Sequence, residues 1–539
     1  MQKIIEKEIK NKLIEAIKTG KANQHYLDSI KRYISKKYKI PIISNRELIK
    51  VYKKIVKRKK DLKSKKIEDI LRVRKVRSTS GVVIVSVLTK PYPCGGACLF
   101  CPAEKGVPKS YLSNEPAVMR ALLNKYNPYK QVYSRLKALD ENLHPIDKVD
   151  LRIIGGTWSY HPKNYQKYFI KECFRACDNY GRKKPLPFNT DLLKLQKINE
   201  KTKSRIIGIN VETRPDYINP QEVKRLRELG ITRIELGVQT IYDDILEKNN
   251  RGHGVKEIIE ATELLKIAGF KICYQMMPNL PFSTPEKDIK MFKEIFDNPK
   301  FRPDHLKIYP LALVKEAPLY YIKDKIGFKV YSYKELVDIL KEVKKHIPYY
   351  CRIQRVIRDI PATSILEGGT KVSNLREIVL KELEKEGLKC KCIRCREVKN
   401  NFSPNDKIYL FKEEYEASNG KEIFLSFETK NRDKLFSILR LRFNYPSENL
   451  KEVQKQLKVL KDSALIRELQ TFGKLSSIGK KEKLSPQHKG LGKKLMEEAE
   501  KIAKKEGVKK MCVISGVGVR DYYRKLGYNL QETYMVKKL

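Results

Sequence analysis

The sequence predicts a multidomain α/β protein, in which a partial (βα)6 barrel follows a basic helical extension and precedes a smaller α+β domain. Three observations lead to this prediction. Apolar runs and amphipathic stretches alternate from about residue 81 to 310, as in parallel βα units. From about residue 401 the chain is strand-rich and then carries a glycine-rich loop that leads into a helix. The first 80 residues hold 26 Lys and Arg against 8 Asp and Glu, with apolar residues at helical spacing.

The charge of the whole chain points to a polyanionic partner. Its 539 residues, enough for two or three domains, carry a formal net charge of +50. Such an excess favours nucleic acid, with a basic membrane-surface protein as the rival explanation. No apolar run approaches the ~18–20 residues of a membrane span, and no signal-peptide pattern opens the chain. Because the eleven cysteines cluster at ligand-like spacings, we expect a reduced, cytoplasmic protein with no membrane association.

Residues 1–75 are predicted to form the basic helical extension. A Ser44-x-x-Glu47 capping box indicates the start of its third helix. One face of that helix is basic, with Lys50, Lys53, Lys54, Lys57 and Arg58. A charge run of this kind is usually a solvated face. Since the excess here has one sign, we favour a nucleic-acid-binding role.

Residues 76–370 are predicted to form the barrel, with an active site at the carboxyl ends of its strands. The expected strands are the six apolar runs Val82–Leu88, Leu151–Ile154, Arg205–Val211, Arg233–Val238, Lys271–Met276 and His305–Tyr309. The expected helices are the amphipathic stretches Tyr165–Cys177, Pro220–Leu229, Val255–Ala268 and Glu286–Phe296.

Three thiols, Cys94, Cys98 and Cys101, directly follow the first expected strand. Three thiolates ligate three corners of a 4Fe-4S cluster and leave one iron open. Radical S-adenosylmethionine (SAM) enzymes bind SAM at that iron. A zinc knuckle is the alternative, but zinc needs a nearby fourth ligand, and no Cys or His lies between Cys101 and His144. The loop therefore predicts a radical SAM barrel that uses a 4Fe-4S cluster and SAM.

Polar residues at the other strand ends are candidates for holding SAM. Gly155-Gly156-Thr157 follows the second strand, where radical SAM enzymes place a glycine-rich loop. Asn210, Glu212 and Gln239 end later strands, although single polar residues there are more often caps or turn formers. Further on, a basic cluster could contact phosphate or form an ion-pair network; it comprises Arg352, Arg355 and Arg358 with Asp359.

A second thiol group lies in the predicted linker, residues 371–400. Cys390, Cys392 and Cys395 fall within six residues, a spacing that suits one tetrahedral zinc ion. The alternative is three unligated surface thiols. A fourth ligand would come from elsewhere in the chain, and the candidates are Cys351, His305 and His346.

Residues 401–539 are predicted to form an acetyltransferase domain of the GNAT type. Gln487-x-x-Gly490-x-Gly492 leads into a helical stretch, and such a loop binds the pyrophosphate of acetyl-CoA through backbone N–H groups and the helix N-terminus. The lone loop is weak evidence, but a strand-like run precedes it and another follows the helix. Tyr522 and Tyr523 are the candidate catalytic side chains, and a Tyr pair in the core or on the surface is the alternative.

A radical SAM loop and a GNAT loop in one chain resemble the family of Elongator catalytic subunits. The resemblance runs from about residue 70 to the C-terminus and includes the Cys94 loop, residues 355–361 and residues 513–528. It implies a tRNA-modifying transferase that acts on the anticodon wobble uridine. A SAM-derived radical would remove a hydrogen atom from the methyl group of acetyl-CoA. The resulting carbon radical would add to carbon 5 of uracil, and hydrolysis of the thioester would leave 5-carboxymethyluridine. An archaeal-type single chain would not require accessory subunits, and a homodimer is compatible with the sequence.

The resemblance also implies which residues contact acetyl-CoA. They are Lys148, Glu468, Leu469, Gln470, Thr471, Pro486, Gln487, His488, Lys489, Gly490, Gly492 and Tyr522. Family members often read Glu-Leu-His-Val where this chain has Glu468-Leu469-Gln470-Thr471, so a role for a His side chain there is not supported.

Two other functions remain open at this point. One is a protein lysine acetyltransferase with a structural iron–sulfur cluster, for which a net charge of +50 makes a lysine-rich peptide a poor substrate. The other is a non-catalytic tRNA-binding scaffold that responds to acetyl-CoA. Loss of the three cluster cysteines would leave the scaffold's function unchanged.

Overall fold

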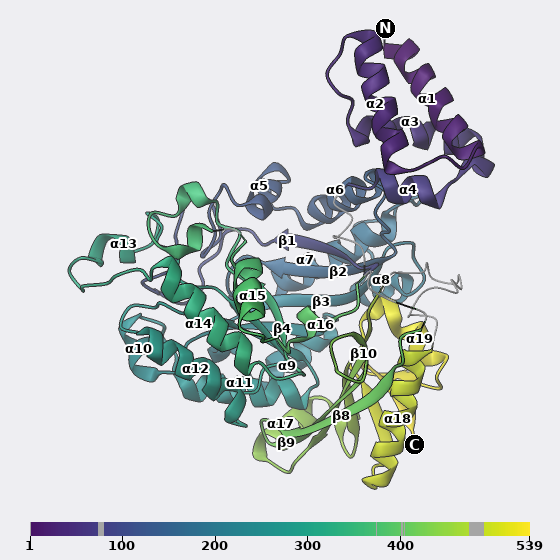
Figure 1. Cartoon of the computed structure of the whole chain (residues 1–539). Helices are drawn as coiled ribbons and strands as arrows, with labels where there is room; N and C mark the ends of the chain where they lie inside the picture. Colours follow the sequence, from purple (N-terminus) through teal and green to yellow (C-terminus); the bar gives the residue numbers. More distant parts are fainter. Residues whose placement is uncertain (1, 74–79, 373, 400–402, 404, 474–489) are drawn as a thin grey trace.

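The computed structural model describes the whole chain except residues 1, 74–79, 373, 400–402, 404 and 474–489. Figure 1 shows a group of N-terminal helices that stands apart above α6, a central sheet wrapped by helices, and a C-terminal sheet packed against one end of the central sheet. None of the helices in the described part combines the length and apolarity needed to cross a membrane.

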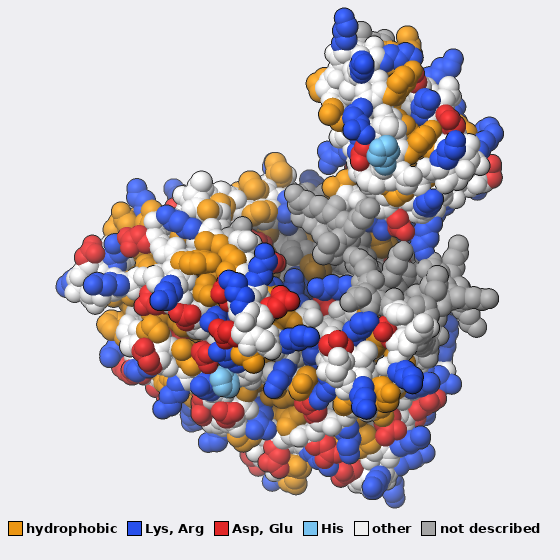
Figure 2. Space-filling view, viewed as in Figure 1, with side chains coloured by type: hydrophobic (Ala, Val, Ile, Leu, Met, Phe, Trp, Pro, Cys, Tyr) orange, Lys and Arg blue, Asp and Glu red, His pale blue; other side chains and the backbone are white. Residues whose placement is uncertain are grey.

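Within residues 2–73, which the structure describes, the N-terminal module has four α-helices around its own apolar core. They are α1 (Gln2–Lys18), α2 (Gln24–Tyr38), α3 (Asn45–Arg58) and α4 (Lys65–Leu71). The predicted capping box of Ser44 and Glu47 is confirmed at the start of α3. Lys53 and Arg72 fasten the module to the end of α6 (Pro128–Glu141) by donating to the backbone oxygens of Asp140 and Leu143, each at 2.7 Å. Lys and Arg outnumber acidic side chains on the face of the module seen in Figure 2.

The central sheet is fully parallel, and its strands lie in chain order. They are β1 (Val83–Leu88), β2 (Lys148–Ile154), β3 (Arg205–Thr213), β4 (Arg233–Gln239), β5 (Lys271–Met276), β6 (His305–Ile308) and β7 (Arg352–Val356). The sequence predicted six strands, and the structure has a seventh. The seventh was missed because Arg352 and Arg355 interrupt its apolar pattern and suggested a basic cluster.

Helices between the strands cover the outer face of this open half-barrel (Figure 1). The helices that lie between β1 and β7 in the chain are α5 (Pro116–Leu123), α6, α7 (Lys163–Asn179), α8 (Leu192–Asn199), α9 (Pro220–Glu228), α10 (Asp243–Lys248), α11 (Val255–Ile267), α12 (Pro285–Asp297), α13 (Leu319–Ile322) and α14 (Tyr333–His346). Two short helices then lead to the C-terminal sheet: α15 (Leu375–Lys385) and α16 (Ile393–Arg396).

The C-terminal sheet is mixed, in the order β13-β14-β12-β11-β10-β9-β8. Its strands are β8 (Tyr409–Glu416), β9 (Gly420–Glu428), β10 (Leu435–Asn444), β11 (Ala464–Thr471), β12 (Lys510–Val513), β13 (Asn529–Gln531) and β14 (Tyr534–Lys538). Its helices are α17 (Glu448–Gln456), α18 (Leu491–Lys505) and α19 (Arg520–Arg524). Only residues 464–466 of β11 pair with β12, which ends at Val513, so residues 467–471 of β11 extend past the end of β12. We call the region between this free part of β11 and the segment that follows β12 the wedge.

A buried ion network joins the amino ends of the barrel strands to the C-terminal sheet. Arg467 of β11 lies 2.5 Å from Asp304, just before β6, and 2.8 Å from Glu422 of β9. Arg440 of β10 lies 3.5 Å from Asp304, and both side chains are fully buried. Removing one partner of such a buried pair typically costs about 3–5 kcal/mol, because the other charge is left unpaired.

The same junction also includes direct backbone packing. A Cβ on Gly516 would lie 1.9 Å from the carbonyl oxygen of Ile207 in β3, and a Cβ on Gly518 would lie 2.6 Å from the Cβ of Arg205. Both positions therefore require glycine, because any side chain would push the C-terminal sheet away from the barrel.

Candidate active site

The cysteine loop leaves the carboxyl end of β1, as predicted. Its backbone is held from outside, since the Leu99 N–H donates to the Asn249 oxygen at 3.1 Å. A Cβ on Gly96 would lie 2.0 Å from Nη1 of Arg214, so this position needs glycine for the arginine to approach the loop. Arg251 donates to the Sγ of Cys98 at 3.4 Å. The loop therefore brings two arginines against its thiols.

The two thiol groups of the chain differ in geometry. The Sγ atoms of Cys390, Cys392 and Cys395 all lie within 4.8 Å of one another, close enough to share a single ion. Cys94, Cys98 and Cys101, all described, do not form such a tight group. A four-iron cluster places each thiolate on a different iron and so spreads its ligands further apart. This wider spacing suits a cluster rather than one zinc ion at the Cys94 loop.

A cavity of about 270 Å³ adjoins the Cys94 loop and contains the groups that SAM would need. Gly156, Thr157, Glu212, Gln239 and both arginines line it. Nη1 of Arg214 and Nε of Arg251 are buried and have no hydrogen-bond partner among the described residues. Buried, unpaired guanidinium N–H groups are suited to a carboxylate, such as that of the methionine part of SAM.

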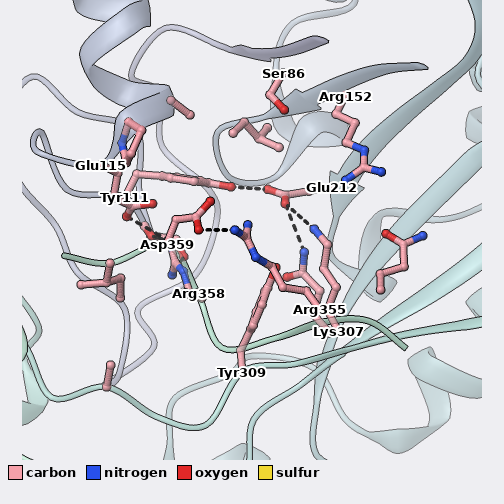
Figure 3. A pocket seen from close by; sticks show the side chains of 18 of the residues that line it. Ser86, Tyr111, Glu115, Arg152, Glu212, Lys307, Tyr309, Arg355, Arg358 and Asp359 are labelled. Atoms are coloured by element: carbon pink, nitrogen blue, oxygen red, sulfur yellow. Dashed lines mark hydrogen bonds and ion pairs between the residues drawn. The ribbon is translucent and has the colours of Figure 1, made fainter. Parts of the chain in front are cut away.

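A larger cavity of about 740 Å³ fills the inside of the half-barrel (Figure 3). The hydroxyl of Tyr111 donates to Glu212 at 2.7 Å, and Gln275 donates to the same carboxylate at 3.2 Å. Lys307 lies between Glu212, at 3.5 Å, and the buried Glu235, to which it is ion-paired. Five residues line both cavities, so the two meet: Phe100, Ser110, Glu212, Gln239 and Gln275.

Burial and neighbouring charge control the carboxylates of this cavity. Burial raises the pKa of Glu212, aided by the charge of Glu235 and opposed by Lys307. Burial would also raise the pKa of Glu235, but the positive charges of Lys307, Arg233 and Arg152 together outweigh it and keep that pKa low. Glu212 is thus the carboxyl that protonates more readily, and it lies where the cavities meet.

The other predicted polar residues divide between the cavity and the scaffold. Arg355 and Arg358 make ion pairs with Asp359 and Glu115, so the predicted ion-pair network is confirmed (Figure 3). Both arginines also line the large cavity, and contact with phosphate stays a prediction. Arg352 does not line the cavity and pairs with Glu397. Asn210 also lies outside both cavities, where it donates to Glu235 at 2.8 Å, so its side chain belongs to the scaffold.

The thiols of Cys390, Cys392 and Cys395 lie beside Lys344, whose Nζ is 3.9 Å from the Sγ of Cys390. None of the three candidates for a fourth ligand belongs to this group among the described residues. His305 pairs with Gln354 at 2.6 Å, the His346 ring contacts the Glu342 oxygen, and the backbone oxygen of Cys351 accepts from Ile393.

The wedge between β11 and β12 gathers several of the residues implied for acetyl-CoA. A Cβ on Gly492 would lie 3.1 Å from the hydroxyl of Tyr522, 3.6 Å from Oγ1 of Thr471 and 4.0 Å from Leu469. Gly490 stands at the N-cap of α18 with φ +67°, a conformation that favours glycine. Pro486, Gln487, His488 and Lys489 lie outside the described residues.

The other candidate residues for acetyl-CoA binding and catalysis lie in different surroundings. Tyr523 is buried in the apolar core of the C-terminal sheet, whereas Tyr522 is 39% exposed. The Glu468 side chain pairs with Arg440 at 2.8 Å, and Gln470 pairs with Ile438 of β10 through the backbone. Lys148 begins β2 beside Arg205, which packs against Gly518, so it lies at the junction of the two sheets.

Sequence reasoning missed several residues of the large cavity, chiefly Tyr111, Gln275 and Lys307. Gln275 and Lys307 lie within predicted strands, and polar residues in such apolar runs were a signal that could have found them. Tyr111 comes from the long loop after the cysteines, where no periodicity identifies the direction of a side chain.

Family models match three parts of the chain. The radical SAM superfamily matches residues 92–295, the radical SAM C-terminal domain matches 303–385, and the acetyltransferase (GNAT) family matches 483–528. The barrel and the C-terminal sheet are therefore a radical SAM domain and a GNAT domain.

Several relatives extend over nearly the whole chain. It is 42% identical to the tRNA uridine(34) acetyltransferase of Methanocaldococcus infernus, over 98% of both chains. It is 45% identical to the Methanocaldococcus jannaschii protein of the same name and 36% identical to human Elongator complex protein 3, in each case over 87% of this chain. Those alignments cover 87% and 86% of the relatives. Among solved structures, the archaeal M. infernus Elp3 with an N-terminal deletion matches with TM-score 0.72 at 41% identity, over 85% of this chain and 100% of the other.

Proposed function

The chain belongs to the family of tRNA uridine(34) acetyltransferases and Elongator complex protein 3, and on this basis we propose that it modifies the wobble uridine of tRNA. More specifically, we propose that it joins the acetyl group of acetyl-CoA to carbon 5 of that uridine, giving 5-carboxymethyluridine. The proposal rests on the family, on the two meeting cavities in the barrel and on the wedge in the GNAT domain.

One observation carries this proposal beyond simple acetyl transfer. The GNAT sheet is fixed to the barrel by the buried network around Asp304 and by the backbone contact of Gly516 with Ile207. Two centres that acted independently would not need so close a junction. A reaction that begins on acetyl-CoA and ends on a base in the barrel does need a close junction, because the reacting groups must be held at fixed positions relative to each other.

The residues around the Cys94 loop would hold the 4Fe-4S cluster and SAM, which together supply a carbon-centred radical able to remove hydrogen from an unactivated methyl group. Arg214 and Arg251 would hold the SAM carboxylate. In the large cavity, Tyr111 and Lys307 surround Glu212 with O–H and N–H donors, which suit the carbonyl groups of a pyrimidine. Glu212 would hold a proton at the point where cofactor and base meet.

In the GNAT domain, Gly490, Gly492 and the N-terminus of α18 would bind the pyrophosphate of acetyl-CoA, with the backbone of Leu469 to Thr471 along one side. Tyr522, rather than Tyr523, would face the thioester. The Cys390 group would hold a structural zinc ion. The basic N-terminal module would bind tRNA phosphates, with Lys50 and Lys57 exposed for that purpose.

Analysis of tRNA nucleosides by mass spectrometry tests the proposal. The protein with its iron–sulfur cluster would be incubated without oxygen with tRNA, reductant, SAM and acetyl-CoA. We expect 5-carboxymethyluridine, and expect none when SAM or acetyl-CoA is omitted. An acetylated nucleoside formed without SAM would replace the proposal with ordinary acetyl transfer.

A further inference from the structure

Three arginines from separate elements lie around one segment of β7 beside the large cavity. Arg352 lies on β7, Arg376 on α15 and Arg394 on α16, and the last two line the cavity. Nη2 of Arg376 donates to the Ile353 oxygen at 3.0 Å, and Nη1 of Arg394 donates to the Gln354 oxygen at 2.8 Å. Both arginines are thus fixed to the backbone of β7. We call these three residues the rim cluster.

The rim cluster has more positive charge than its neighbours neutralise. Glu397 pairs with Arg352 at 2.9 Å. Yet Nη1 of Arg352 and Nη1 of Arg376 are both buried, with no hydrogen-bond partner in the part of the chain that the structure describes. Burying a charged N–H group without a hydrogen-bond partner is unfavourable, so this arrangement suits an anion.

The thiol group beside α16 explains how the rim cluster is held. Arg394 stands between Cys392 and Cys395, two of the three thiols that can share one ion. The Ile393 N–H also donates to the Cys351 oxygen at 3.0 Å, directly before β7. The short helix α16 therefore fixes the orientation of Arg394. It keeps this arginine near Arg352 and Arg376 despite the repulsion between their like charges.

We propose that Arg352, Arg376 and Arg394 form a phosphate-binding site that holds the RNA backbone at the entrance of the large cavity. The site deepens the proposed function and rests on it. The planar guanidinium group places its N–H donors where they can bond two oxygens of a phosphodiester. Several guanidinium groups close together favour phosphate over a neutral group, because their positive charges add. A phosphate held at the rim lets the attached base enter the cavity toward Glu212, while the backbone stays outside. The site therefore positions the nucleotide and does not read its sequence.

Acetyl-CoA is the second source of phosphate. The guanidinium of Arg352 lies 5.9 Å from the ring centre of Phe472, which follows β11. RNA is favoured because Arg376 and Arg394 line the barrel cavity, whereas the residues gathered around Gly492 form the wedge.

The salt dependence of RNA binding tests the site. A fluorescent anticodon stem-loop would be titrated by anisotropy at several salt concentrations with the full chain and with the variants Arg376→Gln and Arg394→Gln. Each variant should bind roughly tenfold more weakly, as expected for one charge-assisted contact. The slope of log affinity against log salt should become shallower by about 0.7–0.9. Lys256→Gln, on α11 and 81% exposed at its side chain, is the control with the same loss of charge and should change neither quantity.

Two further measurements make the test decisive. Arg376→Lys should keep the salt slope but lose affinity, since it retains the charge without the planar fork. Each Gln variant loses a hydrogen bond to the β7 backbone, so its thermal midpoint would be measured as well. Weaker RNA binding at a temperature well below that midpoint excludes misfolding as the cause. Calorimetry with CoA should give the same affinity in all variants.

The contrary outcomes are distinguishable. Weakened CoA binding with an unchanged RNA salt slope would assign the phosphate to CoA and overturn the proposal. Unchanged RNA and CoA binding in both Gln variants would overturn the site alone. Failure of the unaltered protein to bind the stem-loop would overturn the proposed function as well.

Discussion

Gly516→Ala is the change that tests most selectively whether the barrel and the GNAT domain act together. Gly516 has extended backbone, so alanine adds no torsional strain there. Its Cβ would lie 1.9 Å from the Ile207 oxygen and 2.4 Å from the Ile207 carbon. Because nonbonded heavy atoms pack best at about 3.5–4.0 Å, the two backbones must separate by roughly 1 Å or more. Overpacking of this kind costs about 1–3 kcal/mol in stability.

The separation should affect coupled chemistry more than either centre alone. A displacement of about 1 Å between reacting groups can cost roughly a hundredfold in rate. We therefore expect the formation of modified nucleoside to fall by about that factor, as measured by mass spectrometry of digested tRNA. Formation of 5′-deoxyadenosine and binding of CoA should persist, because neither requires the junction.

Gly507→Ala provides the matched control on the same domain. Gly507 has φ +75° and no atom within 4 Å of an added Cβ, so alanine there costs about 1–2 kcal/mol of backbone strain without moving the domains. Its nucleoside product should stay near the unaltered level. Equal product from both variants would refute the argument that the junction keeps the two centres in register.

Three further predictions concern the cluster, the junction and the N-terminal module. Replacing any thiol of the Cys94 loop with Ala should abolish the visible iron–sulfur absorbance and SAM cleavage, and persistence of 5′-deoxyadenosine in a triple variant would contradict the radical assignment. Burial would raise the pKa of Glu468, but the neighbouring basic groups, chiefly Arg440, together outweigh it and lower that pKa to about 2. Since the folded pKa is the lower one, the stabilisation exists above about pH 4.5 and is lost as pH falls toward 2. Glu468→Gln should therefore remove about 3 kcal/mol of pH-dependent stability in denaturant titrations, and unchanged acid unfolding would count against it. Reversing Lys50 and Lys57 to Glu should weaken tRNA binding and flatten its salt dependence while CoA binding survives, and unchanged tRNA affinity would make this face merely solvated.

Much of the fold could be predicted because its local signals agree with its tertiary structure. Strand β5 has the predicted bounds Lys271–Met276, and the Ser44 capping box begins a helix as expected. Apolar strands buried on both faces and side-chain caps are encoded by residues close together in the chain. Strands β7 and β10 were missed because arginines interrupt their apolar pattern. In the folded chain those arginines pair with acidic residues distant in the sequence or line the large cavity, and neither outcome can be seen from the local sequence.

The site was predictable where a motif fixes the chemistry, and not where the fold brings distant residues together. The spacing of the cysteines indicated which thiols belong together. It could not indicate that Tyr111 would bond to Glu212, or that Arg394 would meet Arg376. Such contacts depend on loop paths and on the way the two sheets dock. Tyr522 and Tyr523 show the same limit, since adjacent identical residues end in the wedge and in the core.

The measurement that tests the central claim most directly is the fate of the acetyl hydrogens. Acetyl-CoA with a deuterated methyl group would be supplied with tRNA, SAM and reductant, and 5′-deoxyadenosine would be analysed by mass spectrometry. If a SAM-derived radical acts on the acetyl methyl group, deuterium should pass into 5′-deoxyadenosine, and Gly490→Glu, which blocks the CoA pyrophosphate, should abolish that transfer while the iron–sulfur absorbance remains. Ordinary acetyl transfer breaks only the thioester and leaves the methyl hydrogens in place. Modified nucleoside formed without deuterium in 5′-deoxyadenosine would contradict the account.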